Sequence, residues 1–193
     1  KCSGSNSDKI YNPKFPIKLN TKEGMRFISN LYHDGGIGEI NRQPQYTNRS
    51  FKEVQEFLKD AQRLFGRFNR EIKSRISKLS KREYFVINLP TVIGVILISI
   101  GYTSGDKTKN NLETFKFLGS IKSNILIREY LKKAFNDDGY VGERCIGLAQ
   151  ASLIKDKEKP ANILILDKIL LEKLGIKVHG PMLRKRYQNR HGL

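Results

Sequence analysis

Cysteine, acidic residues and long apolar segments are all scarce in this sequence. The two cysteines among its 193 residues, Cys2 and Cys145, are far apart, which excludes a disulfide scaffold and disfavours a cysteine-based zinc module. The longest apolar run, Thr91 to Ile100, is shorter than the ~20 residues that cross a bilayer, so we expect no membrane association. The chain starts at Lys1 without a signal-peptide pattern, which is typical of a piece of a longer protein.

The shortage of acidic residues leaves a strong positive charge. Lys and Arg number 36 against 19 Asp and Glu, which gives a formal net charge of +17 and an isoelectric point near 9.9. Such an excess attracts a polyanion, and nucleic acid is the first candidate. Hydrophobic residues make up 38% of the chain, enough for a core, and its length corresponds to one large domain or two small ones.

Helix and strand signals in the first half follow the order α-β-β-α-β-β-α. Asn20 and Glu23 form a capping box at the start of a helix that ends at the Asp-Gly-Gly of residues 34–36. A second capping box, Ser50 with Glu53, begins the next helix. The other elements that we expect are strands over 15–19, 36–40 and 45–47, two strands within 67–89, and a buried apolar helix over 90–101.

The second half repeats landmarks of the first at a nearly constant offset. The matching pairs are Asp34 and Asp138, Gln45 and Gln150, and Gly66 and Gly175. The elements expected here are a helix over 128–138, strands within 140–152, a helix over 161–174 and a basic strand from residue 176. The predicted organisation is an N-terminal arm over 1–14, a first repeat over 15–102, a linker over 103–122 and an incomplete second repeat over 123–193.

Two nine-residue segments carry a specific resemblance. Residues 27–35 read Phe-Ile-Ser-Asn-Leu-Tyr-His-Asp-Gly, residues 131–139 read Leu-Lys-Lys-Ala-Phe-Asn-Asp-Asp-Gly, and both resemble the LAGLIDADG motif of homing endonucleases. The resemblance covers roughly residues 15–190. It implies an α+β fold in which two αββαββα repeats, related by a pseudo-twofold axis, form a DNA-binding saddle. It also implies a site-specific, double-stranded DNA endonuclease that works as a monomer with an internal pseudo-dimer.

The resemblance assigns a metal site as well. It implies that Asp34 and Asp138 are catalytic metal ligands at the ends of two neighbouring helices, and that the backbone carbonyls of His33 and Asp137 contribute. Two carboxylates that meet repel one another, so such a site needs a divalent cation, here Mg²⁺ or Mn²⁺. The cation serves phosphodiester hydrolysis by activating water and stabilising the leaving oxygen.

Two glutamines receive a catalytic part from the resemblance, which implies that Gln45 and Gln150 help to order water around the metals. A base-reading or solvent-facing position on a strand is an equally good interpretation of both. Two departures from the family pattern are Lys133, where the third motif residue is usually Gly, and the lack of a Lys at the strand end before Pro90. They keep open two alternatives, a DNA-binding regulator that has lost cleavage and an RNA-splicing maturase.

Basic residues concentrate in two stretches that we expect to be equivalent strands. Residues 67–82 contain seven Lys or Arg and one acid, and residues 177–190 contain five and no acid. A basic strand face suits the phosphates and base edges of a DNA groove, although a solvated face is the simpler alternative. The candidate DNA-binding residues are Arg70, Lys73, Arg75, Lys78, Lys177, Arg184 and Arg186.

Other kinds of site have little support. The three histidines, His33, His179 and His191, lack the spacing of zinc ligands, and no nucleophilic triad is evident. The resemblance, together with the excess of basic residues, implies double-stranded DNA as the partner. The expected location is the cytoplasm, in association with the nucleoid, or an organelle if the source is eukaryotic.

Overall fold

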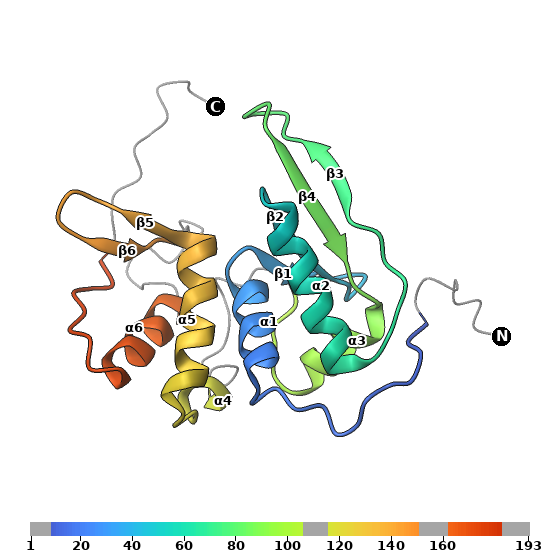
Figure 1. Cartoon of the computed structure of the whole chain (residues 1–193), viewed down its shortest axis with the longest axis horizontal. Coiled ribbons are helices and arrows are strands. Elements are labelled where there is room, and N and C mark those ends of the chain that lie inside the picture. Colours follow the sequence, from blue (N-terminus) through green and yellow to red (C-terminus); the bar gives the residue numbers. More distant parts are fainter. Residues whose placement is uncertain (1–8, 106–115, 151–161, 183–193) are drawn as a thin grey trace.

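The computed structural model describes residues 9–105, 116–150 and 162–182, which form an α+β fold (Figure 1). The helices are α1 (Lys22–Tyr32), α2 (Phe51–Phe65), α3 (Thr91–Ser99), α4 (Lys116–Gly119), α5 (Asn124–Asp138) and α6 (Asn162–Lys173). The strands are β1 (Gly35–Ile37), β2 (Pro44–Asn48), β3 (Lys73–Ile76), β4 (Glu83–Asn88), β5 (Gly139–Val141) and β6 (Ile146–Leu148). The predicted α+β class is confirmed.

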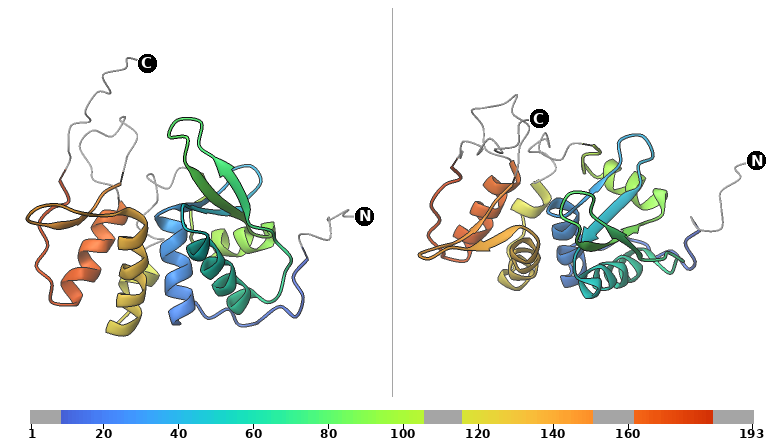
Figure 2. Two further views of the ribbon diagram at one scale, coloured as in Figure 1. Left: turned by 45° about the horizontal axis from the view of Figure 1, so that its top comes forward. Right: turned by 90° about the horizontal axis from the view of Figure 1, so that it is seen from above.

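A row of helices carries the two β-structures. Helices α6, α5, α1 and α2 lie side by side in that order (Figures 1 and 2). Above α1 and α2 lies a four-stranded antiparallel sheet in the order β1-β2-β4-β3, and β5 pairs with β6 in a separate antiparallel hairpin. None of the helices in the described part of the chain combines the length and apolarity that a bilayer crossing requires.

Helices α1 and α5 form the centre of this row and run parallel. The guanidinium of Arg26 contacts Glu129 near one end of the pair, and the ring of His33 contacts Asp138 at the other, so residue numbers rise together along both helices. Strand β1 follows α1 and strand β5 follows α5 on the same side of the row, where both helices have their C-termini (Figure 1). The residues at the C-terminal ends of α1 and α5 therefore lie close together.

Side-chain caps and aromatic packing fix α1 and α2. Helix α1 begins after Thr21, whose hydroxyl accepts a hydrogen bond from the backbone N–H three residues on at 3.1 Å, so the predicted cap at Asn20 is wrong by one residue. Helix α2 begins after Ser50, as predicted. The ring of Phe27 in α1 stacks on that of Phe57 in α2, with 5.1 Å between centroids, and both rings are fully buried. These contacts anchor the sheet-bearing half of the molecule to α1.

The two faces of the sheet differ in character because strand side chains alternate. Tyr46 of β2 is buried on the helix side, where its ring lies 4.7 Å from that of Phe57. Gln45 points to the opposite face. The register Lys73↔Val86 and Arg75↔Tyr84, continued into β2 by Gln45↔Asn88 and Thr47↔Val86, places both basic residues of β3 on that same outer face. We call the face that carries Gln45, Lys73 and Arg75 the outer sheet face.

Two predicted strands do not form. Residues 15–19 contain no strand, because Pro16 has no backbone N–H to donate to a ladder, and the arm is joined to the body instead by an isolated bridge between Tyr11 and Arg67. The predicted basic strand from residue 176 is absent over the described residues 176–182. There Gly180 has φ +99° and Pro181 again lacks a donor, so an extended ladder is interrupted.

Two helical regions begin earlier or extend further than the sequence pattern indicates. Helix α5 starts at Asn124 rather than at residue 128, because Ile127 adds a buried position one turn before Tyr130 and Leu131. Part of the predicted linker 103–122 is ordered: its described residues include α4, and Leu118 is buried against the core. Residues 116–122 of the predicted linker thus contribute a buried side chain to the core.

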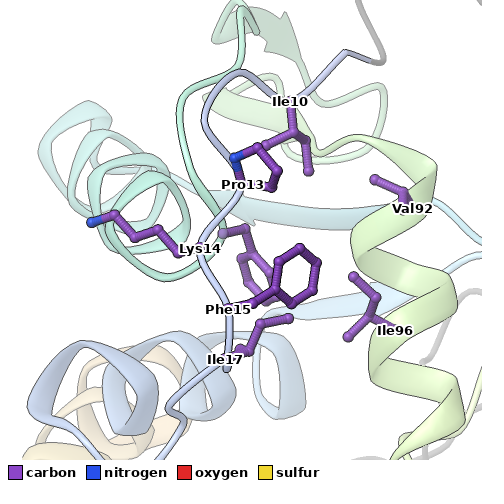
Figure 3. Close-up of a pocket in the computed structure, with 8 residues that line it drawn as sticks. Ile10, Pro13, Lys14, Phe15, Ile17, Val92 and Ile96 are labelled. Atoms are coloured by element: carbon purple, nitrogen blue, oxygen red, sulfur yellow. The ribbon is translucent and has the colours of Figure 1, made fainter.

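Helix α3 is only half buried, which corrects the prediction of a buried helix. Ile93 and Leu97 face the core, whereas Val92, Val95 and Ile100 remain exposed, and α3 lies outside the row of helices (Figure 2). The N-terminal arm passes beside it. Figure 3 shows the apolar hollow between them, with a volume of about 370 Å³ and lined by Ile10, Pro13, Lys14, Phe15, Ile17, Phe65, Val92 and Ile96.

Candidate active site

Three carboxyl groups gather where α1 and α5 end. Asp34 follows the last turn of α1, and Asp137 and Asp138 close α5. The side-chain amide of Asn48, in β2, donates to Asp34 Oδ2 at 3.1 Å and to Asp137 Oδ1 at 3.3 Å. One amide group thus contacts carboxyl groups from both helix ends, so Asp34 and Asp137 lie within the reach of a single side chain.

The surroundings of Asp137 change its pKa. Its Oδ1 accepts a hydrogen bond from the hydroxyl of Tyr46 at 2.9 Å, and its Oδ2 is buried without a hydrogen-bond partner among the described residues. Burial, and next the negative charge of Asp34, raise the pKa of Asp137 to about 8, although the hydrogen bond from Tyr46 opposes the change. Asp137, next to Asp34, therefore tends to keep its proton at neutral pH unless a cation binds between them.

This raised pKa predicts a pH-dependent stability. An acid whose pKa is higher in the folded state than its ordinary value of 3.8 gives its full contribution to stability below that value and loses it as the pH rises through the folded-state pKa. In EDTA, raising the pH from about 5 to about 8 should therefore destabilise the parent relative to Asp137→Asn by up to about 4 kcal/mol, as measured by urea denaturation. Glu143→Gln, on the exposed hairpin turn, is the matched control. Parallel pH profiles for the parent and Asp137→Asn would contradict the prediction.

Asp138 has different partners. Its Oδ2 lies 2.8 Å from Nδ1 of His33, and the amide of Gln150 donates to the same oxygen. The His33 ring is completely buried. Asp138 is therefore held from the side of α1 and from the end of the β5–β6 hairpin, while Asp137 is the carboxyl group linked to Asp34 through Asn48.

The two predicted catalytic glutamines occupy unlike places. Gln150 contacts Asp138 inside the acidic group. Gln45 lies on the outer sheet face, where its amide donates to Asn88 Oδ1 at 2.8 Å, and it is exposed. The structure thus brings Gln150 to the carboxyl groups and places Gln45 beside the basic strand residues.

Most of the described basic candidates lie on or near the sheet. Lys73 and Arg75 are exposed on the outer sheet face, Lys78 is exposed in the β3–β4 turn, and Arg70 is half-buried ahead of β3. Lys177 is exposed beyond α6, away from these four in the chain. Arg184 and Arg186 lie outside the described residues.

A hollow connects the acidic group with the β3–β4 turn. It has a volume of about 470 Å³ and is lined by Asp34, Thr47, Asn48, Arg49, Ser77, Lys78, Leu79, Ser80, Arg82, Glu83 and Tyr84. Three of these residues, Arg49, Lys78 and Arg82, are basic, and one, Asp34, belongs to the acidic group. A phosphate seated in this hollow would meet guanidinium and ammonium groups within reach of a carboxylate.

The donor chemistry fits a hard divalent cation. The groups that converge here are carboxylate oxygens, the type of ligand that Mg²⁺ prefers, and Mg²⁺ is commonly bound by only one or two carboxylates with water completing its shell. The buried Oδ2 of Asp137 and the repulsion between Asp137 and Asp34 are the features that a cation would relieve. Over the described ranges there is no ready-made cluster of three His, Cys, Asp or Glu side chains with the geometry of a metal site.

Lys133 stands where the resemblance leads us to expect Gly. Its side chain leaves the α1–α5 contact and reaches α2, where its ammonium binds Glu53 and lies 2.9 Å from Glu56 Oε2. Ser29 of α1, the third residue of the first motif-like segment, is buried, and its hydroxyl donates to the backbone carbonyl of Tyr130 at 2.8 Å. The small residue thus lies at the close helix contact and the large one is directed away from it.

Sequence reasoning missed Asn48 and Tyr46, which contact the carboxyl groups, and Asp167 of α6, which is buried near His33. The alternation of β2 carried a signal for the first two, since a strand with Tyr46 facing the helices turns Asn48 the same way. No protein-family model and no curated protein matches this chain.

Proposed function

We propose that this chain is a site-specific endonuclease of the LAGLIDADG type, which hydrolyses both strands of duplex DNA with Mg²⁺ or Mn²⁺. The observation that carries the proposal is the meeting of the parallel helices α1 and α5, whose ends gather Asp34, Asp137 and Asp138 next to a sheet with a basic outer face. The order helix-strand-strand-helix occurs over 22–65 and again over 124–173. This recurrence supports two copies of one unit around the α1–α5 contact, and therefore a monomer with an internal pseudo-dimer.

The cation would be held by carboxylates from both helices. The family resemblance assigns Asp34 and Asp138, with the backbone carbonyls of His33 and Asp137; the shared amide of Asn48 favours Asp34 with the side chain of Asp137. A bound cation supplies an activated water and stabilises charge on the leaving oxygen. The protein's own side chains would orient the carboxyl groups and bind the DNA.

Each of the protein's own groups has a defined task in this proposal. Tyr46 and Asn48 hold the carboxyl groups of Asp137 and Asp34 in place, and Gln150 holds Asp138. The outer sheet face binds the DNA backbone through Lys73 and Arg75. Gln45, on the same face, is placed to contact base edges, which matches the base-reading interpretation of its position.

DNA binding without cleavage is a second candidate, and one observation favours it. Asp138 is already engaged by His33 and Gln150, and this hydrogen bonding satisfies its Oδ2 without a metal. A regulator of this kind would need only the basic sheet, and the acidic group would then serve to join α1 to α5.

Cleavage of a randomised duplex library distinguishes the two candidates. The chain is incubated with the library and Mg²⁺, and cut ends are captured and sequenced. We expect ends that align on one target sequence and that vanish in EDTA. Enrichment of bound duplexes without cut ends, in Mg²⁺ and in Mn²⁺, would favour the regulator, and neither ends nor enrichment would contradict both.

The outer sheet face yields a separate prediction about binding. Replacing Lys73 and Arg75 together with Ala should weaken binding to every duplex and reduce the slope of log K against log salt by about 2, since each phosphate contact contributes about 0.9. Fluorescence anisotropy over a salt series measures this slope. The matched control is Lys22→Ala with Lys59→Ala, which removes the same charge from exposed positions on α1 and α2. Equal slopes for the two double variants would show that the outer sheet face does not contact phosphates.

A further inference from the structure

A buried acid, Asp167, lies on α6, a helix that supplies none of the three carboxyl groups described above. Asp167 in α6 is 1% exposed, and the other buried residues of this helix, Ile163, Leu166 and Leu170, are apolar. Burying a carboxyl group without a partner costs several kcal/mol, so such a residue persists only where a polar group compensates it or where function requires it. Burial raises the pKa of Asp167 to about 6, and the proximity of His33 opposes this change.

The group that faces Asp167 is the imidazole ring of His33. Asp167 Oδ1 lies 3.8 Å from Nε2 of this ring, within ion-pair distance for a protonated ring but beyond hydrogen-bond distance, and both atoms are buried without a hydrogen-bond partner among the described residues. The other ring nitrogen, Nδ1, lies 2.8 Å from Asp138 Oδ2. One fully buried ring therefore has a carboxyl group at each nitrogen, one from α6 and one from the end of α5.

This arrangement restricts the ring from several sides. The ring of Tyr130 meets it edge-on with 6.0 Å between centroids, and the His33 side chain has no exposed surface. Turning the ring would break the contact with Asp138 and would remove Nε2 from Asp167. A histidine that is fixed at one nitrogen presents the other in a defined direction, which is how outer partners of metal sites set the orientation of inner ligands.

We propose that Asp167 is a positioning residue that fixes the Asp138 carboxylate through the ring of His33. This inference rests on the proposed function, because it assigns Asp138 to the catalytic group. It extends the site to α6. This helix is given no DNA contact in the proposed function, but its Asp167 would orient a carboxylate at the reacting centre. Asp167 is not itself a catalytic residue, since it acts only through His33.

The test is a mutant cycle with a matched control. Asp167→Asn should lower kcat for the cleaved duplex by about 10-fold, the low end of the effect of removing an outer partner, and should leave KM unchanged. Glu172→Gln removes one charge from the exposed side of the same helix and should change neither. In a His33→Gln background, Asp167→Asn should cause no further loss, because its route to Asp138 is already broken.

A second readout does not depend on cleavage. The ring N–H signals of His33 in ¹⁵N-labelled protein report how the ring is held, and they should shift or broaden in Asp167→Asn but not in Glu172→Gln. Unchanged signals, or additive losses with His33→Gln, would overturn the inference. A parent that shows no cleavage would instead count against the proposed function, and the ring signals would still decide whether Asp167 holds His33. If Asp167→Asn fails to fold, Asp167→Ser is measured in the same way.

Discussion

Asp34→Asn should reduce Mg²⁺-dependent double-strand cleavage by roughly 10²- to 10³-fold, the scale of loss when charge stabilisation is removed from a reacting centre. The substitution preserves shape and removes one negative charge from a pair that already shares the amide of Asn48. Duplex binding should stay the same or tighten, because a carboxylate near phosphates repels them when no cation is bound. Cleavage is measured on the duplex recovered from the library, and binding is measured in EDTA.

Two further substitutions separate the possible metal ligands. If Asp138 is the partner of Asp34, as the resemblance implies, Asp138→Asn should match Asp34→Asn, and Asp137→Asn should be milder. If the geometry around Asn48 decides, the order is reversed. Glu39→Gln, in the exposed connection after β1, is the control and should leave cleavage unchanged. Normal cleavage by Asp34→Asn would remove this residue from the site.

Lys133→Ala should lower the free energy of unfolding by about 3 kcal/mol, which is the low end of the cost of removing one partner from a buried ion pair. The Lys133 side chain is 4% exposed, and its loss leaves Glu53, at 21% exposure, without its cation. Although burial lowers the pKa of Lys133, its hydrogen bonds to Glu53 and Glu56 raise it above its ordinary value, so the group is charged at neutral pH. This cluster is the link between α5 and α2.

The control for Lys133 is its neighbour. Lys132 is exposed, and Lys132→Ala should change the free energy of unfolding by less than about 0.5 kcal/mol. Urea denaturation with far-ultraviolet circular dichroism measures both variants. Equal effects of the two substitutions would show that the contacts of Lys133 with Glu53 and Glu56 contribute no more to stability than an ordinary surface charge does.

The helices and the main sheet could be predicted from the sequence because their signals are local. Ser50 caps α2 as expected, and the apolar residues of α1 recur at helical spacing and are buried. The two strands that do not form have a common cause. Strand pairing is set by distant partners, so the expected strand at 15–19 gave way to a bridge from Tyr11 to Arg67 once Pro16 had removed a donor.

The candidate site could be predicted only in outline. The Asp-Gly ends of two segments indicate that Asp34 and Asp138 belong together, but side-chain direction depends on contacts between elements that no local pattern encodes. Asn48, in β2, donates a hydrogen bond to Asp137, whereas His33, at the end of α1, contacts Asp138. Lys133 departs from the expected motif but has its partners on α2, where Glu53 lies eighty positions earlier in the chain.

The parallel alignment of α1 and α5 has an electrostatic consequence for the whole molecule. The peptide dipoles of a helix sum to about half a negative charge at its C-terminus, and two such ends meet here beside three carboxyl groups. In a chain with a net charge of +17, the two helix ends and their carboxyl groups thus form a negative region next to the sheet. The field of the helix pair favours cations and opposes anions in this region. Under the proposed function, DNA phosphates would therefore settle against the helix ends only together with positive ions.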